Sequence, residues 1–185
     1  MSTSTSSSPA AALIVGRHVR LRAWTPADVP FFVALRNDLA TQVALMARPR
    51  PSNADRVVDW LTRRTDDDRV AFFVIAAADR DEACGFIELR DIDAVHRRAM
   101  LGVAVAFSHR GRGYATEALA LIEAYGRDLL GLRKIVLEVR SDHETAAALY
   151  ARAGYATVGV LAEHFYHDGA FHDVTVMEKR LVGAS

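Results

Sequence analysis

The sequence predicts an α/β fold in which helices cover both faces of one mixed, mostly antiparallel sheet of about seven strands. Strand-like segments occur in runs, three in the middle of the chain and two at its end. Amphipathic helical segments separate these runs, which gives the order β-α-α-β-β-β-α-β-α-β-β. The chain has 185 residues, 51% of them hydrophobic, and is therefore long enough for one full core.

Alternating apolar and polar residues over His18–Trp24 predict a half-buried first strand. A helix follows at Thr25–Asp28, where Thr suits the N-cap, Pro the first helical position and Asp the first turn. The prolines of Met46–Pro51 then indicate a loop. Ser52–Asp55 begins a second helix, which we expect to run to about Arg64.

Three further strands are predicted over Val70–Ala78, Ala83–Asp91 and Arg98–Ala106. Polar turn residues separate them, so we expect an antiparallel set. A long helix follows over about Tyr114–Leu130, and Gly131 is its stop signal.

The last part of the chain adds a strand at Lys134–Arg140 and a helix at His143–Ala153. Two longer strands, Tyr155–His167 and Ala170–Leu181, follow this helix. The Asp-Gly pair at Asp168–Gly169 is a strong turn signal, so these strands are predicted to form a hairpin.

The chain shows no internal repeat or linker, so we expect a disordered Ser/Thr-rich tail over residues 1–12 and a single domain over 13–183. The first nine residues have no basic residue and no long apolar core, which is unlike a secretion signal. The one cysteine, Cys84, excludes an internal disulfide and is expected to be a buried structural thiol. A cytoplasmic location follows as the expectation.

Composition also limits the partners. The formal net charge is zero, so no basic face for nucleic acid is implied. No apolar run approaches the roughly 20 residues of a membrane span, so no membrane partner is expected. His164, His167 and His172 suggest a metal, but strand positions three apart lie on opposite faces, and we therefore predict no metal site.

A glycine-rich turn joins the fourth predicted strand to the long helix. Gly111 and Gly113 allow close approach to the backbone, and Arg110 and Arg112 add positive charge. Free amides at a helix N-terminus favour an anion, so the turn is typical of a phosphate site. It lacks the sequence of a Walker A loop and the spacing of a dinucleotide fingerprint. A tight strand-to-helix connection without a ligand is the alternative.

Two separate motifs give this chain a family resemblance. Arg110–Ala115 matches the pattern Arg/Gln-x-x-Gly-x-Gly/Ala, and His143–Tyr155 is similar to Asn-x-x-Ala-x-x-Leu-Tyr-x-x-x-Gly-Phe. With the element order, these motifs resemble the Gcn5-related N-acetyltransferase (GNAT) superfamily. Gly85–Leu89, His96–Ala99 and Asp168–Met177 resemble its spermidine/spermine N-acetyltransferase and RimJ/RimL-like branch. The resemblance covers roughly residues 18 to 181.

The resemblance implies a GNAT fold and acetyl-CoA as the co-substrate. In this family the fourth and fifth strands splay apart, and the pantetheine arm pairs with the exposed backbone. The diphosphate is then held by the amides of the glycine turn. His143 stands where the family usually has Asn and is expected to be a weaker contact or a helix cap. The implied cofactor-binding residues are Val103, Ala104, Val105, Arg110, Gly111, Arg112, Gly113, Tyr114, Ala115, Thr116 and His143.

Acetyl transfer to an amine needs a neutral amine and a proton donor for the departing thiolate. Tyr150 matches the general acid of the family, and a phenol with a pKa near ~10 is protonated at neutral pH. The alternative for Tyr150 is packing beside Leu149. Glu88 is our candidate base, since strand alternation directs only one of Glu88 and Asp91 inward.

The acceptor side is less well defined. Met100 stands where the polyamine branch has Glu, and Arg48 and Arg50 lie in the loop that carries carboxylates in that branch. Two arginines oppose a polycation and suit a carboxylate or phosphate, unless they are simply solvated. The further candidates for the acceptor cleft are Asp91, His164 and Tyr166.

We therefore expect an acetyl-CoA-dependent N-acetyltransferase. The acetyl group would move to a primary amine of a small molecule, an amino sugar, an amino acid-like compound or a polyamine, by direct attack on the thioester. Two alternatives stay open, namely an acetyltransferase for protein N-termini of the ribosomal type and a non-catalytic acyl-CoA-binding regulatory module. The resemblance also suggests a homodimer, because dimers are common in this branch.

Overall fold

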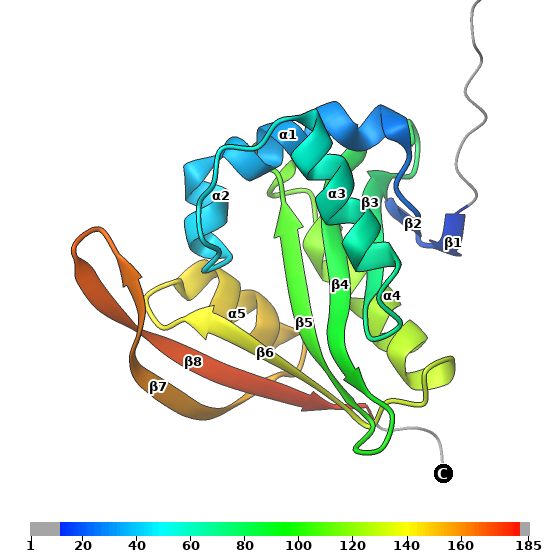
Figure 1. Cartoon of the computed structure of the whole chain (residues 1–185). Helices are drawn as coiled ribbons and strands as arrows, with labels where there is room; N and C mark the ends of the chain where they lie inside the picture. Colours follow the sequence, from blue (N-terminus) through cyan, green and yellow to red (C-terminus); the bar gives the residue numbers. More distant parts are fainter. Residues whose placement is uncertain (1–11, 182–185) are drawn as a thin grey trace, which may run out of the picture.

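The computed structural model describes residues 12–181 and has one sheet of eight strands in the order β1-β2-β3-β4-β5-β6-β8-β7 (Figure 1). All neighbours pair antiparallel except β5 and β6, which are parallel. The predicted α/β class with a mixed, mostly antiparallel sheet is confirmed. The strands are β1 (Ala12–Val15), β2 (Val19–Arg22), β3 (Ala71–Ala77), β4 (Ala83–Asp93), β5 (Arg98–Val105), β6 (Lys134–Arg140), β7 (Ala156–His167) and β8 (Ala170–Arg180).

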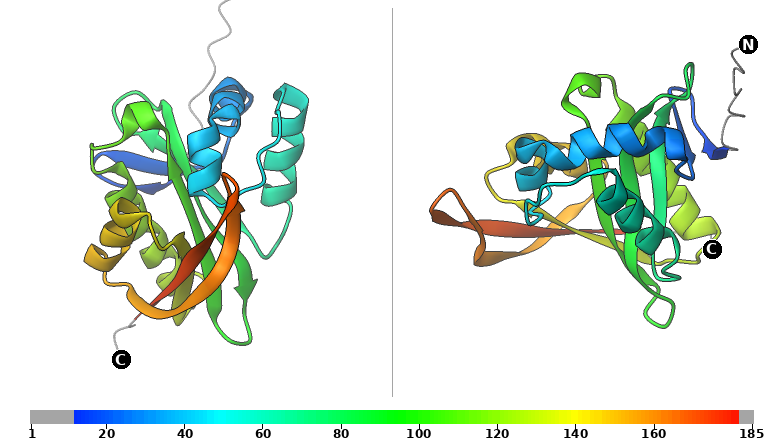
Figure 2. Two further views of the ribbon diagram at one scale, coloured as in Figure 1. Left: turned by 90° about the vertical axis from the view of Figure 1, so that its left-hand side faces the viewer. Right: turned by 45° about the horizontal axis from the view of Figure 1, so that its top comes forward.

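Helices cover both faces of the sheet, as predicted (Figure 2). One face carries α1 and α3, and the other carries α4 and α5. A short 3-10 turn precedes α1 and another precedes α4. The helices are α1 (Val29–Asn37), α2 (Leu39–Ala44), α3 (Ala54–Thr65), α4 (Tyr114–Asp128) and α5 (Glu144–Arg152).

The structure adds two elements to the predicted order. β1 begins at Ala12, the last residue of the stretch predicted as a tail, and pairs with β2. The rest of that tail lies outside the described residues. α2 is a six-residue helix where no helix is expected, and Asp38 caps it by accepting a hydrogen bond from the Thr41 amide at 3.2 Å. Short elements such as these carry too few residues for a periodic signal.

Strand alternation divides the core into two layers. On β3, Phe72 and Val74 pack toward α1 and α3, while Phe73 and Ile75 pack toward α4. Buried apolar residues continue in the same way along β4, so the middle of the sheet is covered on both sides. This arrangement leaves β5 from Leu101 to Val105, and the part of β4 that pairs with it, between helices from both layers.

A buried ion pair fixes the start of α1 against β2. Arg22 donates from Nη1 and Nη2 to the two carboxylate oxygens of Asp28, at 2.7 and 2.9 Å. Burial raises the pKa of Asp28, but the bonds from Arg22 and Thr25 outweigh it, and the pKa is lowered overall. Bidentate pairing of this kind restricts the orientation of the helix that follows.

The sheet opens between β5 and β6. The two strands pair only over Arg98–Met100 and Lys134–Val136. Beyond these pairs β5 follows β4 as far as Val105, and β6 follows β8 as far as Arg140. The family resemblance implies this separation, which leaves an edge of β5 without a strand partner among residues 12–181.

Two further expectations concern exposure. Cys84 is fully buried, and burial raises the pKa of its thiol to about 11, which fits a structural thiol. No helix within residues 12–181 has the length and apolar character needed to cross a bilayer.

Candidate active site

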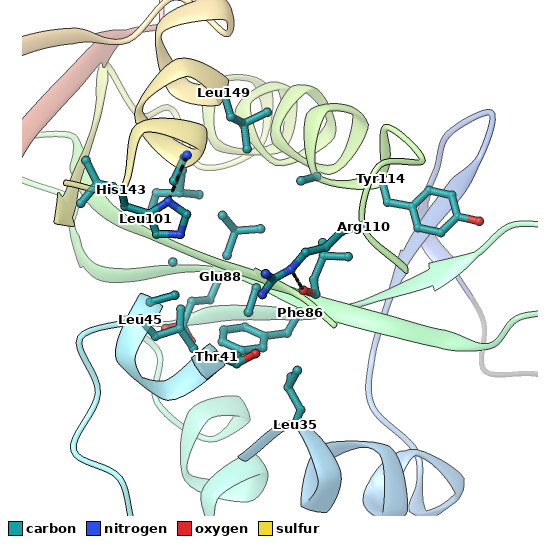
Figure 3. A pocket seen from close by; sticks show the side chains of 18 of the residues that line it. Leu35, Thr41, Leu45, Phe86, Glu88, Leu101, Arg110, Tyr114, His143 and Leu149 are labelled. Carbon is teal, nitrogen blue, oxygen red and sulfur yellow. Dashed lines mark hydrogen bonds between the residues drawn. The ribbon is translucent and has the colours of Figure 1, made fainter. Parts of the chain in front are cut away.

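A cavity of about 670 Å³ lies where β5 and β6 separate (Figure 3). Its walls come from β4 and β5, from α1, α2 and α3 on one side, and from α5 and the start of α4 on the other. One part of the cavity is lined by Glu88 together with side chains of α1 and α3, and another part is lined by Arg110, Tyr114 and the rest of the glycine turn (Figure 3). We call these the acceptor end and the turn end.

The turn end is made mainly of backbone. Gly111 and Gly113 have φ values of 74° and 78°, which favour glycine, and Gly113 is the N-cap of α4. A Cβ on either glycine would meet nothing within 4 Å, so open space lies beside both. Arg110 Nε donates to the Val105 carbonyl at 3.1 Å and so ties the turn to β5.

Ten of the eleven predicted cofactor residues line this cavity. The exception is Arg112, an exposed side chain whose Nη2 donates to the Ser108 carbonyl at 3.4 Å. The unpaired edge of β5 presents backbone groups to the cavity as far as the glycine turn. The backbone at the start of α4 also lines the cavity. A pantetheine arm and a diphosphate fit these two features. The residues of this group that line the cavity are Val103, Ala104, Val105, Arg110, Gly111, Gly113, Tyr114, Ala115, Thr116 and His143.

His143 is the N-cap of α5, one of the two roles expected for it. Its Nδ1 accepts a hydrogen bond from the Ala146 amide at 3.3 Å, so the ring carries no proton at that nitrogen. The side chain also lines the cavity, with its other nitrogen free of protein partners within residues 12–181. The histidine therefore supplies the N-cap of α5 and still presents a side chain to the cavity.

Tyr150 lies on α5 and lines the cavity. Its side chain is 9% exposed, and burial raises the pKa of the phenol to about 12. The ring packs edge-on against Tyr155, with ring centroids 5.9 Å apart. The phenol is therefore held protonated at neutral pH and within reach of the cavity.

Glu88 reaches the cavity from β4 across β5. It is 4% exposed, and its Oε2 accepts a hydrogen bond from Arg64 Nη1 at 2.5 Å. Its strand partner is Gly102, where a Cβ would lie only 3.0 Å from Glu88 Oε1. Burial raises the pKa of Glu88, although Arg64 opposes this rise. A carboxyl in this setting accepts a proton more readily than an exposed one.

The five residues predicted for the acceptor side do not line the cavity. Arg48 and Arg50 are exposed, because the loop leaves the cavity after Ala47. Asp91 sits in a bulge of β4 with a φ of 52°, where it binds Arg90 at 3.1 Å in solvent. Strand alternation thus directs Glu88 inward and Asp91 outward. His164 and Tyr166 are exposed on the projecting β7–β8 hairpin.

Other side chains occupy the acceptor end in their place. Arg36 comes from α1, Trp60 and Arg64 come from α3, and Arg90 comes from β4. The two α-helical arginines lie over the Trp60 ring, with guanidinium carbons 4.6 Å (Arg36) and 5.2 Å (Arg64) from its centroid. Sequence reasoning did not identify Arg36, Trp60 or Arg64 as residues of the site. The only available signal was their position on the predicted helices.

Within residues 12–181, no three His, Cys, Asp or Glu side chains come together in a way that would hold a metal ion. His167 and His172 do approach each other, with ring centroids 6.4 Å apart, and His172 lies 3.4 Å from Asp142. The two histidines lie on the β7–β8 hairpin and Asp142 lies between β6 and α5, and none of the three lines the cavity.

Comparison with known proteins agrees with this geometry. The family model "Acetyltransferase (GNAT) domain" matches residues 18–156. The spermidine N(1)-acetyltransferase of Vibrio cholerae is 29% identical over 157 residues, which cover 85% of this chain and 90% of that protein. The putative ribosomal N-acetyltransferase YdaF of Bacillus subtilis is 25% identical over 86% of this chain and 90% of its own length.

The fold has a close counterpart among solved structures. The Vibrio cholerae spermidine N-acetyltransferase in complex with CoA and spermine superposes with a TM-score of 0.82 at 27% identity, over 89% of this chain and 96% of that one. The family model spans most of the domain, and the cavity combines an open strand edge, a glycine turn and a buried phenol. The chain belongs to the GNAT family and is an acetyl-CoA-dependent N-acetyltransferase.

Proposed function

We propose that the acceptor is the primary amine of a small molecule, which attacks the thioester directly. The observation that carries this proposal is the depth of Glu88, a carboxyl only 4% exposed at the acceptor end of the cavity. An amine must be slender to approach it between β4, α3 and the α1–α2 segment.

Acetyl-CoA supplies an activated acyl group. Tyr150 donates a proton to the departing sulfur, and its raised pKa keeps that proton in place until it is needed. Glu88 accepts the proton of the incoming amine, directly or through water, because its Oε1 is not engaged by Arg64. Arg64 holds the carboxylate in position through Oε2.

The turn end binds and orients the co-substrate. The β5 edge at Val103–Val105 pairs with the pantetheine arm, and the amides that follow Gly113 bind the diphosphate. Arg110 adds charge beside them, whereas Arg112 contributes only long-range attraction from its exposed position.

Thiol release from acetyl-CoA, measured across a panel of amines, tests this function. Small amines should be acetylated with higher kcat/KM than peptides, and acetyl-CoA should bind in the absence of any acceptor. Efficient turnover of peptides alone would favour the ribosomal type of activity found in the name of one relative. Binding of acetyl-CoA with no turnover of any amine would leave a regulatory module and would overturn the proposal.

Polyamines form a second candidate class, since several relatives are spermidine acetyltransferases. Spermidine and spermine therefore belong in the panel. Met100 lies on β5 and does not line the cavity, so the missing Glu at this position is not by itself decisive. The charge at the acceptor end bears on this question more directly.

We also propose that the chain associates with itself through the β7–β8 hairpin. This hairpin projects from the domain (Figure 1) and exposes Val158, Val160, Tyr166 and Phe171 by 54–63%. One solved relative is described as dodecameric. A Val160→Ser, Phe171→Ser double variant should lower the molar mass measured by light scattering, whereas a Leu129→Ser control should not. A wild-type mass of about 20.3 kDa would overturn this proposal.

The cytoplasm is the proposed location. A buried, unpaired thiol at Cys84 suits a reducing compartment.

A further inference from the structure

The cavity of this enzyme has an unequal balance of charge. Five arginines line it, together with two glutamates and no lysine or aspartate. Two of the arginines, Arg110 and Arg152, belong to the turn and to α5. The other three belong to the acceptor end, where Glu88 is the only carboxylate in the lining. The end that receives the amine is therefore net positive.

The three arginines of the acceptor end differ in what they bind. Arg64 pairs with Glu88 at 2.5 Å, and Arg90 pairs with Asp91 at 3.1 Å. Arg36 forms no ion pair within residues 12–181, although it is half-buried and lines the cavity. Its guanidinium lies over the Trp60 ring, a contact that leaves its N–H donors without acceptors.

The position of Arg36 is unfavourable for a free cation. Burial lowers its pKa, and the nearby positive charge of Arg64 lowers it further. An arginine nevertheless stays protonated at neutral pH. Arg64 also has an unsatisfied hydrogen-bond donor, because its Nε is buried and has no hydrogen-bond partner within residues 12–181. An anion beside these two groups would satisfy donors that the protein leaves unpaired.

We propose that the acceptor carries an anionic group, a carboxylate or a phosphate, which Arg36 binds while the amine of the same molecule approaches Glu88. This inference rests on the proposed function, because it assumes an amine acceptor in this cavity. Trp60 supplies the flat surface against which both guanidinium groups are held. The guanidinium fork matches carboxylate and phosphate geometry, and an ammonium group gives no such match.

The same charges oppose a polycation. A polyamine that placed one amine near Glu88 would bring a further ammonium toward Arg36, and like charges in a partly buried site repel each other. The enzyme should therefore differ in acceptor class from its relatives with spermidine in their names.

Matched acceptor pairs test this inference in the wild-type enzyme. Lysine and cadaverine differ by one carboxylate, as do ornithine and putrescine, and glucosamine 6-phosphate and glucosamine differ by one phosphate. We expect kcat/KM to be roughly 10- to 100-fold higher for the anionic member of at least one pair, which is the value of a charge-assisted bond. Equal kcat/KM within every pair, or a preference for spermidine, would overturn the inference.

Variants of Arg36 locate the effect. Arg36→Met keeps an apolar stem over Trp60 and should raise the KM of the anionic acceptor about tenfold or more, with kcat and the acetyl-CoA dissociation constant little changed. Arg36→Lys should recover part of the loss. Arg48→Met is the matched control, because Arg48 is exposed and outside the cavity. An unchanged KM in Arg36→Met would contradict the inference.

A binding measurement separates this inference from the proposed function. The anionic member of at least one pair (lysine, ornithine or glucosamine 6-phosphate) should raise the Tm of the acetyl-CoA-loaded wild type more than its partner without the anionic group does, and Arg36→Met should abolish the difference. If no amine is acetylated but this Tm difference is present, the anion site stands and the small-molecule function fails. If glucosamine 6-phosphate, lysine and ornithine all leave the Tm of the wild type unchanged, the anion site itself is contradicted.

Discussion

The two ends of the cavity are built in different ways. At the turn end, backbone amides and an open strand edge form the surface, and two glycines with positive φ keep side chains out of the way. At the acceptor end, side chains from α1, α3 and β4 form the surface, and two cations share one indole ring. The first surface depends on local conformation, and the second depends on how distant elements pack together.

This difference explains why co-substrate binding can be shared by a whole family while acceptor binding differs from one member to another. A backbone surface tolerates many side chains, because only the glycine positions and the helix start are required. A side-chain surface changes with each substitution. A short motif therefore predicts the co-substrate, whereas under our proposal the acceptor depends on single residues such as Arg36.

Loss of the Tyr150 hydroxyl, the proposed proton donor, should have the largest effect. Tyr150→Phe removes the proton donor and keeps the packing, so we expect kcat to fall about 100-fold with an unchanged acetyl-CoA dissociation constant. Tyr155→Phe is the control, because this neighbouring phenol is buried outside the cavity. Equal kcat in wild type and Tyr150→Phe would remove Tyr150 from the role of acid.

The turn end should respond to one added methyl group. Gly113→Ala strains a backbone with a φ of 78° by about 1–2 kcal/mol and disturbs the start of α4, so acetyl-CoA affinity should fall about tenfold. Gly169→Ala is matched in backbone, with a φ of 75° and no neighbour within 4 Å, but lies in the hairpin turn. Calorimetric titration should show the affinity loss only for Gly113→Ala, although both variants lose stability. Equal acetyl-CoA affinity in both variants would contradict a turn site.

The pH dependence of kcat/KM sharpens the assignment of the acid. The pKa of Tyr150 is raised to about 12, so its acid form is lost only above that pH. Activity should therefore rise as amines with a pKa near ~10 deprotonate, with no fall below about pH 10. A descending limb near neutral pH that disappears in Tyr150→Phe would show that the phenol is not shielded as described.

The smallest effect is expected outside the cavity. Replacing Arg48 and Arg50 by Ala removes two exposed charges that no ion pair within residues 12–181 engages. The KM for an anionic acceptor should change less than about twofold, since exposed charges are strongly screened. A tenfold rise would mean that the loop folds over the acceptor and that the two ends are less distinct than their geometry indicates.

The sequence predicted well those parts of the structure that are determined by residues close together in the chain. Strand periodicity located β6 at Lys134–Arg140, and the glycine stop signals located the ends of α4 and α5 within a few residues. Glycine spacing located the turn, because φ > 0 is a property of single residues. Tyr150 was found through the motif around it, and Glu88 through strand alternation.

The acceptor end was not predictable in the same way. Arg36 and Trp60 are 24 positions apart on separate helices, and only the packing of α1 and α3 on the sheet brings them together. The sequence offered Arg48 and Arg50 instead, because the family resemblance places the acceptor-binding charges of the polyamine branch in their loop. Met46, with a φ of 51°, turns the chain so that Ala47 still lines the cavity and the arginines do not.

The separation of β5 from β6 has a consequence for the protein without ligand. Only three residue pairs, Arg98–Met100 with Lys134–Val136, join a five-stranded part of the sheet to a three-stranded part. A ligand that pairs with this edge, as we propose for the pantetheine arm, would replace the missing strand hydrogen bonds and stabilise the folded state. Amide hydrogen exchange along β5 beyond Met100 should slow on addition of acetyl-CoA, while exchange in β3 should not change.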